Sequence, residues 1–75
     1  MPYIEVRGYP KDEDVKRRVA QRIKQVFAEE WGCPENAISV SFESIAPEDW
    51  DSKVSESVMK PNMDRMYILD GKAVR

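Results

Sequence analysis

The chain has 75 residues, which is enough for one domain and too few for two, so we expect a single domain over residues 1–75. Its 12 basic and 14 acidic residues give a net charge of −2, which argues against nucleic acid and anionic membrane surfaces as partners. The chain contains no histidine and one cysteine, which excludes Ser/His/Asp triads, histidine-based or cysteine-cluster metal sites and an internal disulfide bond.

The first two thirds of the chain predict a strand, a long helix and a second strand. Apolar and polar side chains alternate at residues 3–7, as in a half-buried strand. A glycine and a proline end this strand, and Asp12 is expected to cap an amphipathic helix that ends at Gly32. A second strand with one apolar and one polar face is expected at residues 38–42.

These segments form one βαβ unit, in which the two strands should be parallel and the helix should cover their shared apolar face. The fold class expected is therefore α/β (α+β), with a βαβ core and a carboxyl-terminal extension. A sheet of two strands is too small to be stable alone. We therefore expect oligomerisation to complete the sheet.

The last third of the chain is expected to be mostly helical. Pro47 and the acidic residues after it are typical of a first helical turn, which leads to Trp50. Apolar residues continue at an approximately helical spacing, but Pro61 should interrupt or restart the helix, so we expect two short helical pieces. The pair Asp70-Gly71 lies between apolar residues and is also typical of a hairpin, and the pattern leaves the state of this segment open.

The one unusual chemical feature is Pro2, which directly follows Met1. Removal of the initiator methionine would leave a secondary amine at the end of the chain. Such α-amino groups titrate near pH 7.7 to 8.0, and burial or a nearby cation lowers the pKa further, so the amine can be unprotonated at neutral pH. The proline ring fixes the lone pair relative to the strand, which suits a general base. A Met-Pro start is also common in proteins where it has no such role.

Four segments carry a resemblance to a known family: Met-Pro-Tyr-Ile-Glu-Val at residues 1–6, Lys-Asp-Glu-Asp at 11–14, Trp-Gly at 31–32 and Ile-Ser-Val-Ser-Phe at 38–42. They resemble the 4-oxalocrotonate tautomerase family. The segment Ile-Ala-Pro-Glu-Asp-Trp at residues 45–50, with the residues that follow it, is similar to a longer bacterial branch of phenylpyruvate tautomerase-like proteins.

The resemblance implies an enzyme that needs no metal and no cofactor. In this family the amino-terminal proline, Pro2 here, takes a proton from a small enol or unsaturated 2-oxo acid and returns it elsewhere on the conjugated system. Trp50 falls where the family places an aromatic wall, which would lower the pKa of the Pro2 amine by desolvation. Trp50 is equally typical of an ordinary core residue.

The family also binds the substrate carboxylate with two arginines, which this chain lacks. Lys11 stands near the position of the first arginine and can attract a carboxylate, but it cannot form the planar two-bond fork of a guanidinium. Ser39 stands at the position of the second and offers one hydrogen bond. A monocarboxylate such as the enol of phenylpyruvate therefore fits better than a dicarboxylate. Arg7 and Arg65 are candidate substitutes, although either is more typical of a solvated surface charge.

Two other functions stay open on this fold. A hydratase or dehalogenase of the same superfamily would use the protonated form of the Pro2 amine, and an oligomeric interaction module would use no catalysis at all. The resemblance implies a homodimer, with a hexamer as the alternative. The single cysteine and the lack of a targeting or membrane-spanning segment predict a cytoplasmic protein whose partner is a small-molecule substrate.

Overall fold

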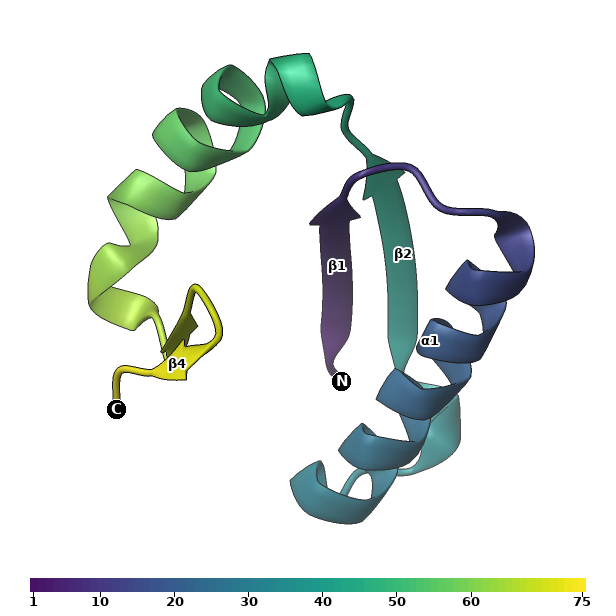
Figure 1. Cartoon of the computed structure of the whole chain (residues 1–75). Helices are drawn as coiled ribbons and strands as arrows, with labels where there is room; N and C mark the ends of the chain where they lie inside the picture. Colours follow the sequence, from purple (N-terminus) through teal and green to yellow (C-terminus); the bar gives the residue numbers. More distant parts are fainter. The chain divides into compact units, whose positions relative to one another are not determined.

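Residues 1–45 fold as a βαβ unit in the computed structural model, which describes residues 1–75 (Figure 1). Strand β1 spans Tyr3–Gly8, helix α1 spans Glu13–Val26 and strand β2 spans Ser39–Ser44. Residues 46–75 form a second compact unit. The α+β class expected from the sequence is confirmed, whereas the single domain over residues 1–75 stays a prediction.

The two strands of the first unit are parallel, as expected, and they pair from Tyr3 opposite Ser39 to Gly8 opposite Ser44. Backbone hydrogen bonds extend this pairing beyond both strand ends. The Ser39 amide donates to the Pro2 carbonyl oxygen at 3.2 Å, and the Ile45 amide donates to the Gly8 carbonyl oxygen at 2.8 Å. Both strands reach further toward their carboxyl ends than the apolar alternation predicts, because the ladder continues to Gly8 and Ser44, and β2 begins one residue later than expected, at Ser39.

Helix α1 begins at the residue that the sequence indicates. The Asp12 carboxylate accepts a hydrogen bond from the Val15 amide at 2.9 Å and so satisfies one of the amides left open in the first turn. Glu13 and Asp14 follow at the positive end of the helix. The Lys16 ammonium lies 2.7 Å from Glu13 Oε1, and this hydrogen bond, with the charge of Lys16, lowers the pKa of the Glu13 carboxyl.

Replacing Asp12 by alanine should lower the free energy of unfolding by about 1 kcal/mol, because the Val15 amide loses its acceptor. The matched control is Asp64→Ala, another exposed aspartate, whose side chain accepts no capping bond and lies in the second unit. Urea unfolding followed by circular dichroism compares the two variants with wild type. Equal midpoints for Asp12→Ala and wild type would show that the cap does not stabilise the helix.

The helix continues past Val26 in a wider π turn, η1 (Phe27–Trp31), and ends at Gly32. Gly32 has φ 73° and ψ 29°, the left-handed conformation that glycine adopts without strain, which confirms the expected end. The rings of Phe27 and Trp31 lie 5.5 Å apart at this end of the helix. The extra π turn has no counterpart in the sequence pattern, which reads as an ordinary amphipathic helix.

Helix α1 packs chiefly against β2. Ala20 and Ile23 of this helix and Phe27 of η1 are half-buried, as are Ile4 and Val6 of β1, so a face shared with the sheet is only partly covered. Ile45 is the one buried residue of this unit. The core of a single copy is therefore small.

The second unit consists of a helical run and a short hairpin. The helical run comprises η3 (Pro47–Asp49), η4 (Asp51–Met59) and η5 (Lys60–Arg65). The expectation of two short helical pieces is confirmed: η4 gives way to η5 at Lys60, where the chain keeps helical dihedral angles and changes from π turns to tighter 3₁₀ turns. Pro61 lies in the first turn of η5, next to the point where the type of turn changes.

The hairpin question that the sequence left open is resolved. Strands β3 (Ile68–Leu69) and β4 (Lys72–Ala73) pair in the antiparallel sense around Asp70 and Gly71. Both turn residues have positive φ, 51° and 81°, as a two-residue hairpin of type I′ requires. Arg75 holds the end of the chain: its Nε donates to the Met66 carbonyl oxygen at 3.0 Å, and its guanidinium lies 5.0 Å from the centre of the Tyr67 ring.

Candidate active site

Pro2 lies at the start of β1, and its backbone is fixed by the sheet. Its carbonyl oxygen accepts the hydrogen bond from the Ser39 amide at 3.2 Å, and the residue is half-buried. Met1 before it is 99% exposed. The position of Pro2 therefore depends on the sheet and not on the methionine.

Ser39 is the predicted site residue that the structure brings next to Pro2. It opens β2 opposite Tyr3, and its side chain is exposed. Because side chains alternate along a strand, Ser39 shares a face of the sheet with Tyr3 and Ser41. The Tyr3 hydroxyl lies 2.6 Å from Ser41 Oγ, a hydrogen bond in which either group can donate. Three hydroxyl groups thus gather on two strands at the end of the sheet where Pro2 lies.

Lys11 lies at the other end of β1. The six residues of this strand span about 20 Å at about 3.3 Å per residue, and Lys11 follows the strand by three residues. Figure 1 shows the chain leaving the arrowhead end of β1 and turning into α1, which runs back toward the amino terminus. Within one copy of the chain, Lys11 and Pro2 are therefore not neighbours.

The two candidate substitute cations differ in their surroundings. Arg7 Nε lies 3.1 Å from Glu5 Oε1 and 3.5 Å from Glu43 Oε2, so two carboxylates already balance its charge. Arg65 donates to the side-chain oxygen of Asn62 and has no carboxylate partner. Arg7 is thus a poor ligand for a substrate carboxylate, whereas Arg65, in the second unit, keeps its charge available.

Trp50 follows η3 directly and is half-buried. Its amide donates to the Pro47 carbonyl oxygen, which closes the turn that Pro47 begins. Trp50 belongs to the second unit and Pro2 to the first.

No protein-family model matches the chain. A search of curated proteins finds the tautomerase PptA of Pectobacterium atrosepticum, which is 32% identical over 68 residues that cover 88% of this chain and 90% of the relative. The chain belongs to the tautomerase superfamily. The tautomerase PptA of Pectobacterium carotovorum is 29% identical over the same shares, and that of Enterobacter sp. strain 638 is 24% identical over 73 residues, 95% of this chain and 96% of the relative.

Membership makes this chain an isomerase of the tautomerase type, as the resemblance implied, and not a non-catalytic interaction module. No cluster of three side chains suited to a metal ion occurs in the tautomerase. None of its helices combines the length and apolar character that crossing a membrane requires.

Sequence reasoning missed two features of the first unit, namely the Tyr3–Ser41 hydroxyl pair on the sheet and the tilted ring pair of Phe27 and Trp31 at the end of the helix. The alternation of the strands carried a signal for the first, because it places Tyr3 and Ser41 on one face once the register is known. The spacing of four residues between Phe27 and Trp31 indicated the ring pair, because residues four apart are neighbours on a helix surface.

Proposed function

We propose that this tautomerase shifts a proton in a small enol or unsaturated 2-oxo acid, with Pro2 as the base and then the acid, after removal of Met1. One observation supports the proposal above all. The Pro2 backbone is held at the start of β1 by a hydrogen bond from the Ser39 amide, whereas Met1 before it is 99% exposed. Removing that methionine breaks almost no packing, and the ladder still holds the Pro2 backbone in place. The reaction needs no metal and no cofactor.

The proton balance of the reaction closes within Pro2. The free amine takes a proton from the enol hydroxyl or an acidic carbon, and the electron pair left behind moves along the conjugated system of the substrate. The protonated amine then returns the same proton to the carbon where the electron pair has arrived. The enzyme is restored, and the substrate is isomerised without net gain or loss of a proton.

Three further residues complete the proposed site. Ser39, next to Pro2, donates one hydrogen bond to the substrate. Trp50 supplies a dry wall that disfavours the charged form of the amine and so lowers its pKa. Lys11 attracts the carboxylate, and because it lies at the far end of β1 in its own copy, the Lys11 that serves a given Pro2 belongs to another copy. One cation suits a monocarboxylate such as the enol of phenylpyruvate.

We further propose that the tautomerase works as a homo-oligomer, a dimer or alternatively a hexamer, in the cytoplasm. Two observations support association. The sheet of the first unit has only two strands, and Ile45 is the one residue of that unit that a single copy buries. A sheet of this size needs further strands or a covering layer for stability.

The pH dependence of the reaction distinguishes the tautomerase from the hydratase or dehalogenase alternative. If the unprotonated amine is the base, kcat/KM for the enol-to-keto conversion of phenylpyruvate should rise with pH to a plateau, with a midpoint below the ordinary range of about 7.7 to 8.0. The measurement is the decay of enol absorbance between pH 5 and 9. A rate that falls as the amine loses its proton would favour hydration or dehalogenation chemistry and would overturn the proposed role of Pro2 as a base.

A further inference from the structure

The polar face of the parallel sheet changes character along the strands. It carries Tyr3, Glu5 and Arg7 of β1 opposite Ser39, Ser41 and Glu43 of β2. The charged residues begin at Glu5, and Arg7 Nε lies 3.1 Å from Glu5 Oε1 and 3.5 Å from Glu43 Oε2, so these charges are held together toward the carboxyl ends of the strands. The other three residues carry only hydroxyl groups, and we call Tyr3, Ser39 and Ser41 the hydroxyl face.

The Tyr3 hydroxyl bonds to a serine beyond its direct neighbour on β2. The register places Ser39 opposite Tyr3 and Ser41 opposite Glu5. The Tyr3 oxygen nevertheless lies 2.6 Å from Ser41 Oγ. Two residues along a strand span about 6.6 Å. The Tyr3 side chain therefore extends along the strand away from Pro2, and Ser41 holds its oxygen further from Pro2 than Ser39 lies.

The Tyr3–Ser41 pair suits a ligand that accepts hydrogen bonds. Tyr3 is 64% exposed, whereas Ser41 is half-buried, so the phenol is the group that a ligand can reach. When Ser41 donates to the Tyr3 oxygen, Tyr3 is free to donate its own proton outward. A carboxylate selects this arrangement, because it accepts hydrogen bonds and has none to donate. Two hydrogen bonds in series that end on a charge also strengthen each other.

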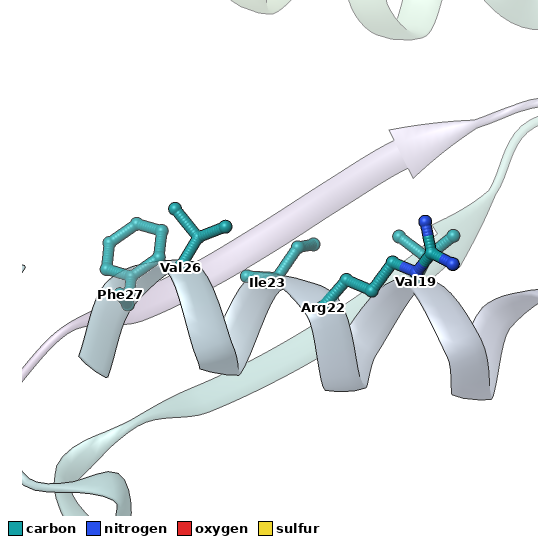
Figure 2. A pocket seen from close by; sticks show the side chains of 5 residues that line it. All are labelled: Val19, Arg22, Ile23, Val26 and Phe27. Carbon is teal, nitrogen blue, oxygen red and sulfur yellow. The ribbon is translucent and has the colours of Figure 1, made fainter. Parts of the chain in front are cut away.

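A competing place for a carboxylate lies on helix α1. A groove of about 260 Å³ is lined by Val19, Arg22, Ile23, Val26 and Phe27. Figure 2 shows the Arg22 side chain next to Val19 in this groove. The helix packs on the side of the sheet where Ile4 and Val6 are half-buried, and side chains alternate along a strand. The groove and the hydroxyl face therefore lie on opposite sides of the sheet, and one small ligand cannot contact both.

We propose that the Tyr3 hydroxyl binds the substrate carboxylate and that Ser41 positions it. The proposal deepens the proposed function and rests on the role of Pro2 in it. A 2-oxo acid carries its carboxylate two bonds from the carbon that exchanges the proton. With a hydrogen-bond distance of about 3 Å at each end, such an acid reaches from the Pro2 amine to the Tyr3 oxygen. Ser39, which lies between them, then donates to the 2-oxygen, and neutral hydroxyl groups orient the carboxylate in place of the two arginines that the chain lacks.

Titration calorimetry with an unreactive acid tests the Tyr3 contact. The probes are 3-phenylpropanoate and its neutral amide, 3-phenylpropanamide. Tyr3→Phe keeps the ring and removes the hydroxyl, so it should raise the Kd of the carboxylate about tenfold and leave that of the amide unchanged. The matched control is Tyr67→Phe, because Tyr67 is 67% exposed and lies in the second unit, and it should bind both probes as wild type does.

Three results of this titration would overturn the proposal. The first is a wild type that binds the carboxylate no more tightly than the amide. The second is a Tyr3→Phe variant that keeps wild-type affinity for the carboxylate or loses affinity for both probes equally. The third is a loss of carboxylate binding in Arg22→Gln but not in Tyr3→Phe, which would put the carboxylate in the helix groove. Circular dichroism of each variant checks that the fold is intact.

Kinetics of the enol of phenylpyruvate test the positioning role of Ser41. Ser41→Ala should raise KM about threefold and keep kcat within about twofold, because the carboxylate contact is the same before and during proton transfer. The double variant Tyr3→Phe/Ser41→Ala should be no weaker than Tyr3→Phe alone, since Ser41 acts through the Tyr3 hydroxyl. Ser44→Ala, at an exposed serine opposite Gly8, is the control and should keep KM. Additive losses in the double variant would contradict the positioning role.

Binding of 3-phenylpropanoate separates this proposal from the proposed chemistry. Pro2→Ala keeps all three hydroxyl groups, so it should bind the carboxylate within about threefold of wild type while it loses turnover. A Pro2→Ala variant that turns over normally would overturn Pro2 as the base, whereas the calorimetric comparison of Tyr3→Phe with wild type would still decide whether Tyr3 binds the carboxylate.

Discussion

Replacing Pro2 by alanine should lower kcat/KM for the enol-to-keto conversion of phenylpyruvate by about 10²-fold, the lower end of the range for loss of a general base. Alanine is also small enough for Met1 to be removed, so the variant keeps an α-amine at the chain end. That amine is no longer held in a ring, and its lone pair can rotate away from the substrate. The decay of enol absorbance at pH 7 measures the effect.

The matched control for this substitution is Pro34→Ala. Pro34 is an exposed proline of the same unit, where it precedes the short 3₁₀ turn η2 (Glu35–Ala37). This variant should retain kcat/KM within about twofold, since its proline has no part in the reaction. If Pro2→Ala and Pro34→Ala convert phenylpyruvate equally fast, Pro2 is not the base.

Replacing Ile45 by alanine should lower the free energy of unfolding by about 2 to 4 kcal/mol. Ile45 is only 4% exposed, and its amide donates to the Gly8 carbonyl oxygen at the end of the parallel ladder. A fold of this length has a total stability of about 4 to 11 kcal/mol, so the loss removes a large share of it. Urea unfolding of the wild type and the variant gives the difference directly.

Ile68→Ala removes the same atoms from a side chain that is 66% exposed. The change in unfolding free energy should stay below about 0.5 kcal/mol, because little apolar surface returns to water. Comparable losses for the two variants would mean that Ile45 is not part of a core.

Local features of the fold were predictable because each depends on a few neighbouring residues. The Asp12 cap, the left-handed Gly32 and the parallel strands follow from side-chain type and spacing, and they appear where expected. The carboxyl ends of both strands were predicted one or two residues too early, because backbone pairing continues past the last residue of the apolar alternation. The state of Asp70-Gly71 was undecided, since the same residues suit a helix end and a hairpin, and the pairing of β3 with β4 decides between them.

The candidate site was predictable only in part. Pro2 was found because a secondary amine at the chain end has an unusual chemistry, and Ser39 follows from the strand register. The separation of Lys11 from Pro2 was overlooked, because nearness in sequence hides the length of the strand between them. That Glu5 and Glu43 together balance the charge of Arg7 could not be predicted either. Glu43 lies on the other strand, so its distance from Arg7 depends on the strand register.

Intact mass spectrometry of the active tautomerase tests the central claim most directly. A Pro2 nitrogen that still carries Met1 is an amide without basicity, so proton transfer by Pro2 requires a free chain end. The fraction active on phenylpyruvate should have the mass of the chain without Met1, and activity should scale with the share of processed chain. A preparation that retains Met1 on every chain and still works at the full rate would contradict it.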